Sequence, residues 1–204
     1  TIQEEGTISP SHSEPTTSTD DSMNSLLSQI QPLLPQNNGS WSVYVCNLVK
    51  NTEGNIDSHP MQAASLIKLY IMGAVYENYE TLLQTYSADT LNNYLNPMIT
   101  VSDNESYNEL VRRNSSYRSF TNGCSVINNY LKKAGCTKTG CHSSLHPSAS
   151  SFSWDGQTNM ASAKDAGLIL EKIYKGKCVS AKYSNEMLNL LLHQTRRWKI
   201  PSGL

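Results

Sequence analysis

The chain has 204 residues, enough to bury one hydrophobic core in a single domain or in a domain with a small lobe. Its 16 basic and 17 acidic residues give a net charge of -1, with no basic run and no interleaved aromatic stripe, so nucleic acid is not expected as a partner. No apolar run approaches the ~20 residues that a membrane-spanning helix needs.

The first segment, residues 1–19, is rich in Thr, Ser, Pro and Glu and has two large apolar side chains. Such a composition cannot form a core and predicts a flexible linker. A folded domain is expected over residues 20–204. It opens with a predicted helix that begins at Asp20 or Asp21, is apolar on one side up to Leu34, and ends at Pro35.

Extended segments are predicted next. A turn at residues 37–39 leads into a strand over 41–49, which is followed by a break over 51–55 and a second extended piece over 59–62. From residue 63 to residue 75 the chain is apolar on every side of a helix, apart from one lysine, which predicts a helix buried all round.

The rest of the chain is predicted to be mainly helical, apart from an extended stretch over 98–101. One helix follows the cap candidate Ser87, another ends at Gly135, a third runs from Ser162 to Gly176, and a fourth begins at Ser184.

Lys68 is the only charged residue between Pro60 and Tyr76. A buried ammonium needs a partner or a lowered pKa, because burial penalises the charged form. Ser65 lies one helical turn earlier on the same face, and a hydroxyl beside a desolvated lysine has the ingredients of a serine nucleophile with a lysine base. The alternative is a lysine that reaches water from one end of a core helix.

A second motif, Ser102-Asp103-Asn104, precedes a helical pattern in Tyr107 and Leu110. Ser102 with Glu105 also fits a capping box, so helix capping is the alternative to a functional role. A Ser-x-x-Lys pattern is expected roughly once by chance in a serine-rich chain. A Ser-Asp-Asn that also opens a helix downstream is far less expected, so the pair of motifs is the stronger signal.

These motifs together resemble those of the penicillin-recognising serine hydrolases and, within them, the class A β-lactamase-like branch. His59 with residues 64–68, residues 160–165 and residues 192–204 are similar to further segments of that family, so the resemblance runs from about Asp20 to Leu204. It implies an α/β (α+β sandwich) fold, with an antiparallel sheet packed by helices plus an all-helical lobe, and no cofactor or metal at the site.

The resemblance also implies a role for each site residue. Ser65 would be the acylated nucleophile, Lys68 its base, and Ser102 the donor of a proton to the leaving nitrogen. Asn104 would hold the side-chain amide of the substrate, and Asp103 would brace the loop. The substrate would be a β-lactam or a D-Ala-D-Ala-like peptide of peptidoglycan. With the linker, this predicts a bacterial extracytoplasmic domain tethered to the membrane or cell wall.

The third motif of the family, Lys-Thr/Ser-Gly, is matched in letters by Lys138-Thr139-Gly140. We interpret this match as chance, because it lies in a predicted loop between Cys136 and Cys141 and not on a strand. In the family the motif follows a segment like residues 200–204. The rest of the sheet is therefore expected from residues beyond Leu204 or from a second chain, without which the strand over 41–49 would expose an apolar edge.

Class A β-lactamases place a glutamate that activates the deacylating water in the region that corresponds to residues 141–159. This chain has no glutamate there, and its one carboxylate, Asp155, is interpreted as a turn residue beside a glycine. His142 and His146 are candidate bases that the sequence does not place near Ser65. Acylation with slow release is therefore predicted. The alternative is a non-catalytic, wall-associated binding or regulatory domain on the same fold.

The five cysteines leave two further interpretations open. A zinc-stapled interaction module is one alternative, because a span of eleven residues holds four ligand-type side chains, Cys136, Cys141, His142 and His146. The spacing is wider than in a tight zinc knuckle. A disulfide among Cys124, Cys136 and Cys141 is therefore favoured over zinc.

Overall fold

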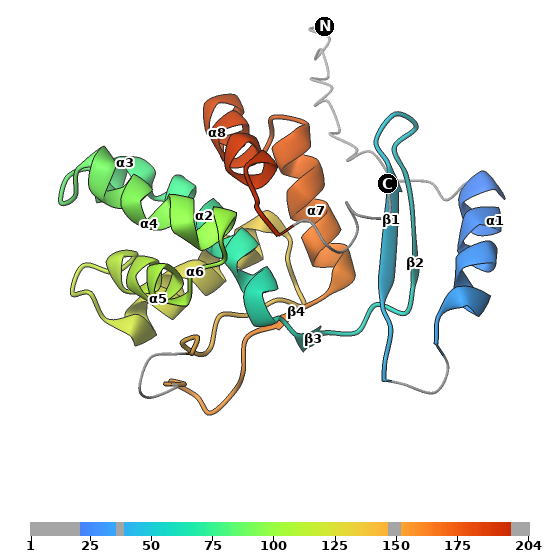
Figure 1. Ribbon diagram of the computed structural model, residues 1–204, viewed down its shortest axis with the longest axis horizontal. Coiled ribbons are helices and arrows are strands. Elements are labelled where there is room, and N and C mark those ends of the chain that lie inside the picture. The colour runs from blue at the N-terminus through green and yellow to red at the C-terminus, as the bar shows by residue number, and fades with distance from the viewer. Residues whose placement is uncertain (1–20, 36–38, 147–151, 197–204) are drawn as a thin grey trace, which may run out of the picture.

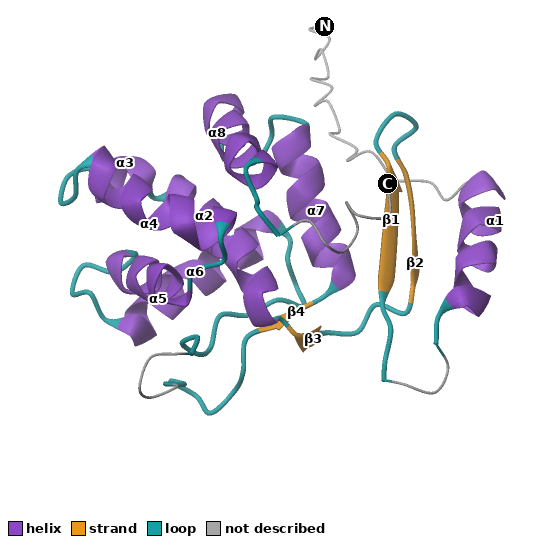
Figure 2. Ribbon diagram, viewed as in Figure 1, coloured by secondary structure: helices purple, strands orange, loops and turns teal. Residues whose placement is uncertain are grey.

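The computed structural model describes residues 21–35, 39–146 and 152–196. It consists of a helical body and, beside it, a β-hairpin flanked by helices (Figures 1 and 2). The linker predicted over residues 1–19 lies outside the described residues. The elements in chain order are α1 (Asp21–Ile30), η1 (Gln31–Leu33), β1 (Val43–Asn47), β2 (Thr52–Ile56), β3 (Met61–Gln62), η2 (Ala64–Leu66), α2 (Ile67–Glu77), α3 (Tyr79–Leu82), α4 (Ala88–Thr100), α5 (Asn104–Arg113), α6 (Phe120–Ala134), β4 (Met160–Ala161), α7 (Ala163–Tyr174) and α8 (Ala181–Leu192).

The hairpin of β1 and β2 is antiparallel and places Val45 opposite Gly54. Because side chains alternate along a strand, the two faces of the hairpin contact different helices. Tyr44 points toward α7, where a Cβ on Gly167 would come within 2.1 Å of its ring. Gly54 faces α1, where a Cβ would come within 2.5 Å of Leu27. The hairpin is thus held between α1 and α7 (Figure 1).

The predicted break over residues 51–55 is wrong, because β2 occupies it. The stretch Thr-Glu-Gly-Asn-Ile shows no apolar alternation, so pairing with β1 and packing against α1 decide its structure rather than local propensity. The turn is tightened by the Asn47 side chain, which accepts hydrogen bonds from the amides of Val49 and Lys50. The extended piece predicted over 59–62 shrinks to β3, which pairs with β4.

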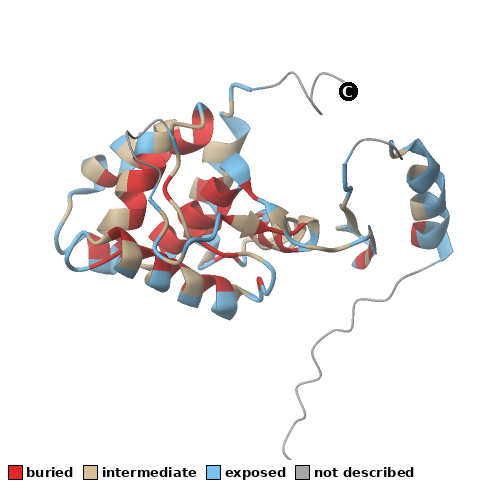
Figure 3. Ribbon diagram, turned by 90° about the horizontal axis from the view of Figure 1, so that it is seen from below, coloured by how far each residue is buried: buried red, intermediate tan, exposed pale blue. Residues whose placement is uncertain are grey.

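Helix α2 is the centre of the helical body, and its residues from Ile67 to Tyr76 are all buried. This confirms the prediction of a helix buried all round. It contacts α4, α5, α6, α7 and α8, and Figure 3 shows the buried residues concentrated in this body, away from the largely exposed α1. No helix in the described part of the chain is long and apolar enough to cross a bilayer.

The predicted helix ends are mostly confirmed. Ser87 and Ser162 are N-caps, and the side chain of each accepts a hydrogen bond from the backbone amide three residues later. Gly135 ends α6 with a φ of 85°. Ser184 does not begin a helix, since α8 starts after the N-cap Ser180. Ser184 is instead buried inside α8 and exchanges hydrogen bonds with the backbone of Cys178.

The extended stretch predicted over residues 98–101 is also wrong, because α4 continues to Thr100. Leu91, Leu95 and Met98 are spaced four and three residues apart and are fully buried, so one apolar helical face extends to the end of α4. The chain therefore leaves the helix at Val101 without the extended stretch that was expected. The turn at this residue leads directly into the Ser102-Asp103-Asn104 motif.

Candidate active site

Ser65 and Lys68 lie at the start of the central helix. Ser65 is exposed in the single turn η2, and Lys68 follows one turn later in α2 with 3% of its surface exposed. Lys68 Nζ lies 3.2 Å from Ser65 Oγ. Residue 64, just before the serine, has a φ of 44° although it is an alanine. Such strained backbone is often found where a side chain must be presented to a ligand.

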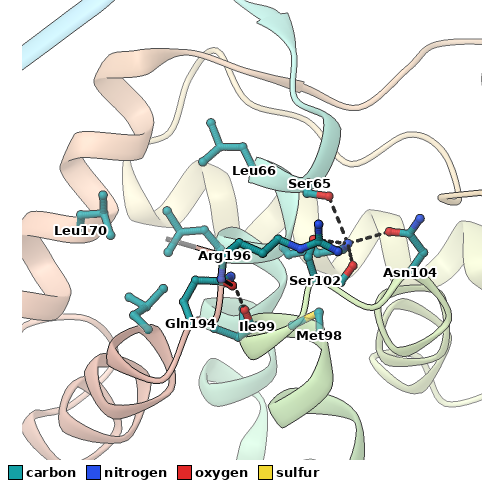
Figure 4. A pocket seen from close by; sticks show the side chains of 12 residues that line it. Ser65, Leu66, Met98, Ile99, Ser102, Asn104, Leu170, Gln194 and Arg196 are labelled. Carbon is teal, nitrogen blue, oxygen red and sulfur yellow. Dashed lines mark hydrogen bonds between the residues drawn. The ribbon is translucent and has the colours of Figure 1, made fainter. Parts of the chain in front are cut away.

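The second motif lies in the turn between α4 and α5. Ser102 has a φ of 63°, and the N-cap of α5 is Asp103, whose carboxylate accepts from the Ser106 amide at 2.7 Å. The capping role considered as the alternative for Ser102 therefore belongs to its neighbour Asp103. This leaves the Ser102 hydroxyl free of a capping role, and its oxygen lies 2.9 Å from Lys68 Nζ (Figure 4).

Four oxygen atoms surround the Lys68 amine. Besides the two serine hydroxyls, the Ser102 carbonyl and Asn104 Oδ1 each lie 2.6 Å from Nζ. An ammonium has three hydrogens, so it cannot satisfy four acceptors fully. The Ser65 contact is the longest of the four. When the Lys68 amine is neutral, this hydrogen bond is the one that can most easily reverse its direction, so that the Ser65 hydroxyl donates to the amine.

Burial lowers the pKa of Lys68 to about 8, with the Asp103 carboxylate opposing this change and the Arg196 guanidinium reinforcing it. About one lysine in ten is then neutral at pH 7, compared with a negligible fraction at the ordinary pKa. Hydrogen bonds from Ser106 hold the pKa of Asp103 below its usual range, although partial burial acts in the opposite direction. The site thus combines an exposed hydroxyl with a buried amine that is able to take up its proton.

The segment after α8 fixes the turn that carries Ser102. The last carbonyls of a helix have no partner within it. In α4 and the residue after it, three successive carbonyls accept instead from this segment: Ile99 from Gln194 Nε2 at 2.6 Å, Thr100 from Thr195 N at 2.9 Å and Oγ1 at 3.0 Å, and Val101 from Arg196 Nη2 at 3.2 Å. Apart from the family resemblance of residues 192–204, nothing in the amino-acid pattern indicates these contacts.

Ser65 borders two cavities, of about 600 and 540 Å³. The first is lined by Lys68, Ser102 and Arg196 together with apolar side chains, and the second by Asn104 and His146. Asn104 Nδ2 donates to the His146 carbonyl, which ties the two walls of the second cavity together. The structure therefore places His146 beside the same cavity as Ser65, a position for which the sequence offered no evidence.

The Lys138-Thr139-Gly140 segment lines neither of these two cavities. Lys138 and Thr139 lie in a loop, as predicted. The Lys138 amide and the Thr139 hydroxyl both donate to Asp165, each at 2.8 Å. The segment thus holds the start of α7 against the end of α6 and takes no part in the arrangement around Lys68.

The four residues of the alternative zinc site contact separate partners. Cys136 Sγ faces the Asp165 carbonyl at 3.9 Å, Cys141 Sγ lies 3.2 Å from Cys124 Sγ, His142 Nδ1 lies 2.7 Å from Asp155 Oδ2, and His146 is exposed beside the cavity. Within the described ranges no three His, Cys, Asp or Glu side chains gather as a metal site would require. Asp155 also accepts from the Gln157 amide, as the turn residue that was predicted.

Comparison with known proteins agrees with the resemblance found in the sequence motifs. The family model described as "Beta-lactamase enzyme family" matches residues 25–84 and 80–204. Among solved structures, the chain is similar to a beta-lactamase from Sphaerobacter thermophilus DSM 20745, with a TM-score of 0.62 and 17% identity over 79% of this chain and 66% of that chain. It is also similar to PBP-A, with a TM-score of 0.70 and 22% identity over 89% of this chain and 73% of that chain.

A mutant of PBP-A, described as an acyl-enzyme complex with penicillin-G, gives a TM-score of 0.69 and 21% identity over 89% of this chain and 74% of that chain. The chain thus spans 66% to 74% of the length of these three structures. A search of curated proteins finds no match. The family match covers nearly all of the chain from residue 25 onward and confirms the resemblance found in the motifs. The chain therefore belongs to the beta-lactamase enzyme family and has the fold of the penicillin-recognising serine hydrolases.

Proposed function

We propose that this chain carries the catalytic serine of an acyl-enzyme hydrolase, which acts on a β-lactam or a D-Ala-D-Ala-like peptide and releases the acyl group slowly. The observation that carries the proposal is the position of Lys68 Nζ, within 3.2 Å of Ser65 Oγ and 2.9 Å of Ser102 Oγ. An amine of lowered pKa between two hydroxyls is a pathway for a proton from the nucleophile to the leaving group.

In the acylation step, Ser65 Oγ attacks the carbonyl carbon of the substrate while its proton moves to the neutral Lys68 amine. The Ser65 amide, at the N-terminal end of the central helix, donates to the oxyanion that develops. Lys68 then returns a proton through Ser102 to the leaving nitrogen, and the acyl group remains on Ser65. In this mechanism Asn104 orients the substrate by binding its side-chain amide, and Asp103 holds the turn in place.

Release of the acyl group requires a base that activates water. Residues 141–159 contain no glutamate, and the His142 imidazole is engaged by Asp155. Removal of a positioned general base typically costs on the order of 10²–10⁴ in rate. We therefore expect the acyl-enzyme to form much faster than it is hydrolysed. The acyl-enzyme complex recorded for the PBP-A mutant supports penicillin-G as the first ligand to test.

The same absence of glutamate favours a second candidate, a non-catalytic domain that binds cell-wall material. The lowered pKa of Lys68 argues against it, because a binding domain has no need of a buried amine next to a hydroxyl. In both cases the partner is a β-lactam or a peptidoglycan-type peptide. We further propose an extracytoplasmic location in a bacterium, with residues 1–19 as a tether to the membrane or wall, on the basis of their linker-like composition.

The test is incubation of the intact domain with penicillin-G, followed by mass spectrometry of the whole protein and of its peptides. A lasting adduct is expected on the peptide that contains Ser65. Ser65→Ala should abolish the adduct, and Lys68→Ala should slow its formation by about 10²-fold or more. A wild-type protein that forms no adduct at any pH between 6 and 9.5, although it is folded, would support the binding domain instead.

A further inference from the structure

Two buried cysteines, neither of which lines the two cavities beside Ser65, contact each other in the helical body. Cys124, on α6, and Cys141, just after the loop that follows α6, both have no exposed surface. Their sulfur atoms are 3.2 Å apart although the residues are 17 positions apart in the chain. A disulfide bond has a sulfur–sulfur distance of ~2.05 Å. A shift of about 1 Å is therefore enough to bring the two atoms into bonding distance.

The backbone around Cys141 is fixed in the same place by a second residue of α6. The Asn128 side chain, one helical turn after Cys124, accepts from the Cys141 amide at 2.8 Å and donates to the Cys141 carbonyl at 3.0 Å. Such a two-sided contact holds Cys141 against α6 whatever the state of its sulfur. The pairing of the two sulfur atoms is therefore imposed by backbone contacts and does not depend on the thiols alone.

The other cysteines have different surroundings. Cys136 Sγ faces the Asp165 carbonyl at 3.9 Å, and Cys178 Sγ lies 3.5 Å from the Tyr130 hydroxyl. Cys46 lies on β1, in the hairpin outside the helical body. Thus, of the five cysteines, only Cys124 and Cys141 have their sulfur atoms in contact within the described part of the chain.

We propose that Cys124 and Cys141 form a disulfide bond when the protein folds in the presence of a disulfide oxidant. In the reaction the two thiols lose two protons and two electrons as the Sγ–Sγ bond forms. A small-molecule disulfide such as oxidised glutathione takes up both and is split into two thiols. The proposal does not depend on the acyl-enzyme chemistry proposed for Ser65.

The timing of bond formation follows from burial. The hydrogen bond with Cys141 and burial itself raise the pKa of Cys124, so in the folded protein this thiol stays protonated. A protonated, enclosed thiol is a poor nucleophile. The bond therefore forms before α6 is fully packed. Once formed, it is shielded from reductants, which makes it a structural bond rather than a reversible switch.

The bond also has a consequence for the second cavity beside Ser65. Cys141 begins the segment whose Leu145 amide donates to Asn108 and whose His146 carbonyl accepts from Asn104. A covalent link at residue 141 anchors one end of this segment to α6, while the two asparagines of α5 hold the other. The disulfide is thus placed to keep one wall of the cavity fixed.

The test is to refold the wild-type chain in a mixture of oxidised and reduced glutathione and to block free thiols with N-ethylmaleimide in denaturant. Three blocked thiols per chain are expected. Trypsin cuts after Lys132 and Lys138, which places Cys124, Cys136 and Cys141 in three different peptides. A linked pair containing Cys124 and Cys141, which separates on reduction, is the expected product. Five blocked thiols, or a link to Cys136, would overturn the proposal.

Variants provide a second readout. Cys136→Ser is the matched control and should keep the linked peptides, whereas Cys124→Ser should lose them. Wild-type chain that is reduced in denaturant and refolded with free thiols should melt about 5–10 °C below the oxidised chain, as expected for a crosslink over a loop of this length. The same treatment should leave the melting temperature of Cys124→Ser unchanged. If this variant does not fold, the peptide map of the wild-type chain still decides the question.

Discussion

Lys68 Nζ lies 2.9 Å from Ser102 Oγ, although the two residues are 34 positions apart in the chain. The contact joins the buried helix α2 to the turn between α4 and α5. The local sequence around neither residue requires this contact, since Ser102 could equally serve as a helix cap. It exists because Asp103 takes over the cap and because residues 194–196 hold the carbonyls that precede the turn.

The first prediction concerns the pH dependence of acylation. Burial lowers the pKa of Lys68 to about 8, and a protonated amine has no lone pair to accept the Ser65 proton. The second-order rate of adduct formation should therefore rise about tenfold per pH unit below pH 8 and level off above it. The rate is measured from pH 6 to pH 9.5 by intact mass. A flat profile over this range would contradict a base role for Lys68.

The second prediction separates the charge of Arg196 from its hydrogen bonds. Two charged groups act on Lys68: the Arg196 guanidinium lowers its pKa and the Asp103 carboxylate raises it. Arg196→Gln should raise the pKa of Lys68, whereas Arg196→Lys should leave it close to the wild-type value. The pKa is read from the ¹³Cε shift of labelled lysine, with no substrate present. Equal pKa values in all three proteins would show that Arg196 acts only through its hydrogen bonds.

A third prediction concerns Asp103, whose carboxylate caps α5 through the Ser106 amide. Asp103→Ala should lower the free energy of unfolding by about 1 kcal/mol, as expected for a lost N-cap. Asp103→Asn keeps the acceptor and should retain most of this stability, but it removes the charge that raises the pKa of Lys68. Urea unfolding measures the first effect. If both variants lose the same stability, the cap is not what Asp103 contributes.

Sequence reasoning was most successful where one residue determines the local structure. Lys68 is conspicuous as a single charge in an apolar helix, and Ser65 is placed beside it by helical spacing alone. Gly135 and Ser162 set helix ends through their own backbone or side-chain chemistry. Each of these features depends on residues within one turn of each other, so the local sequence is enough to predict it.

The sequence was least informative where contacts between distant segments determine the local structure. β2 was missed because pairing with β1 and the approach of α1 to Gly54 stabilise a polar stretch with no strand pattern. Arg196 and His146 were not identified as site neighbours because each comes to border a cavity with Ser65 only through contacts between distant segments of the chain. Capping by Ser102 stays an open alternative in the sequence because spacing cannot tell which of two adjacent polar residues turns toward the helix.

The fourth prediction tests the close contact between the last turn of α5 and helix α6. A Cβ at Gly123 would come within 1.9 Å of the Val111 carbonyl oxygen, which belongs to a helix backbone and cannot move aside. Gly123→Ala should therefore cost about 3 kcal/mol, the upper part of the range for overpacking. Ser125→Ala, at an exposed position of the same helix, is the matched control and should be near neutral. Urea unfolding that finds the two equal would contradict this packing.

The last prediction concerns release of the acyl group. With no glutamate in residues 141–159, the adduct on Ser65 should persist for much longer than it takes to form, and penicillin should be consumed in a burst of about one equivalent. His146 borders the same cavity as Ser65, so His146→Gln shows whether its imidazole assists the residual release, with His142→Gln as the control that lies outside this cavity. Neither change should slow acylation, because the proposed mechanism assigns the proton transfers of that step to Lys68 and Ser102. Intact mass followed over hours after removal of free penicillin gives the lifetime of the adduct. Rapid multiple turnover by the wild-type protein would contradict slow release, and loss of that turnover in His146→Gln alone would identify the imidazole as the base that replaces the glutamate.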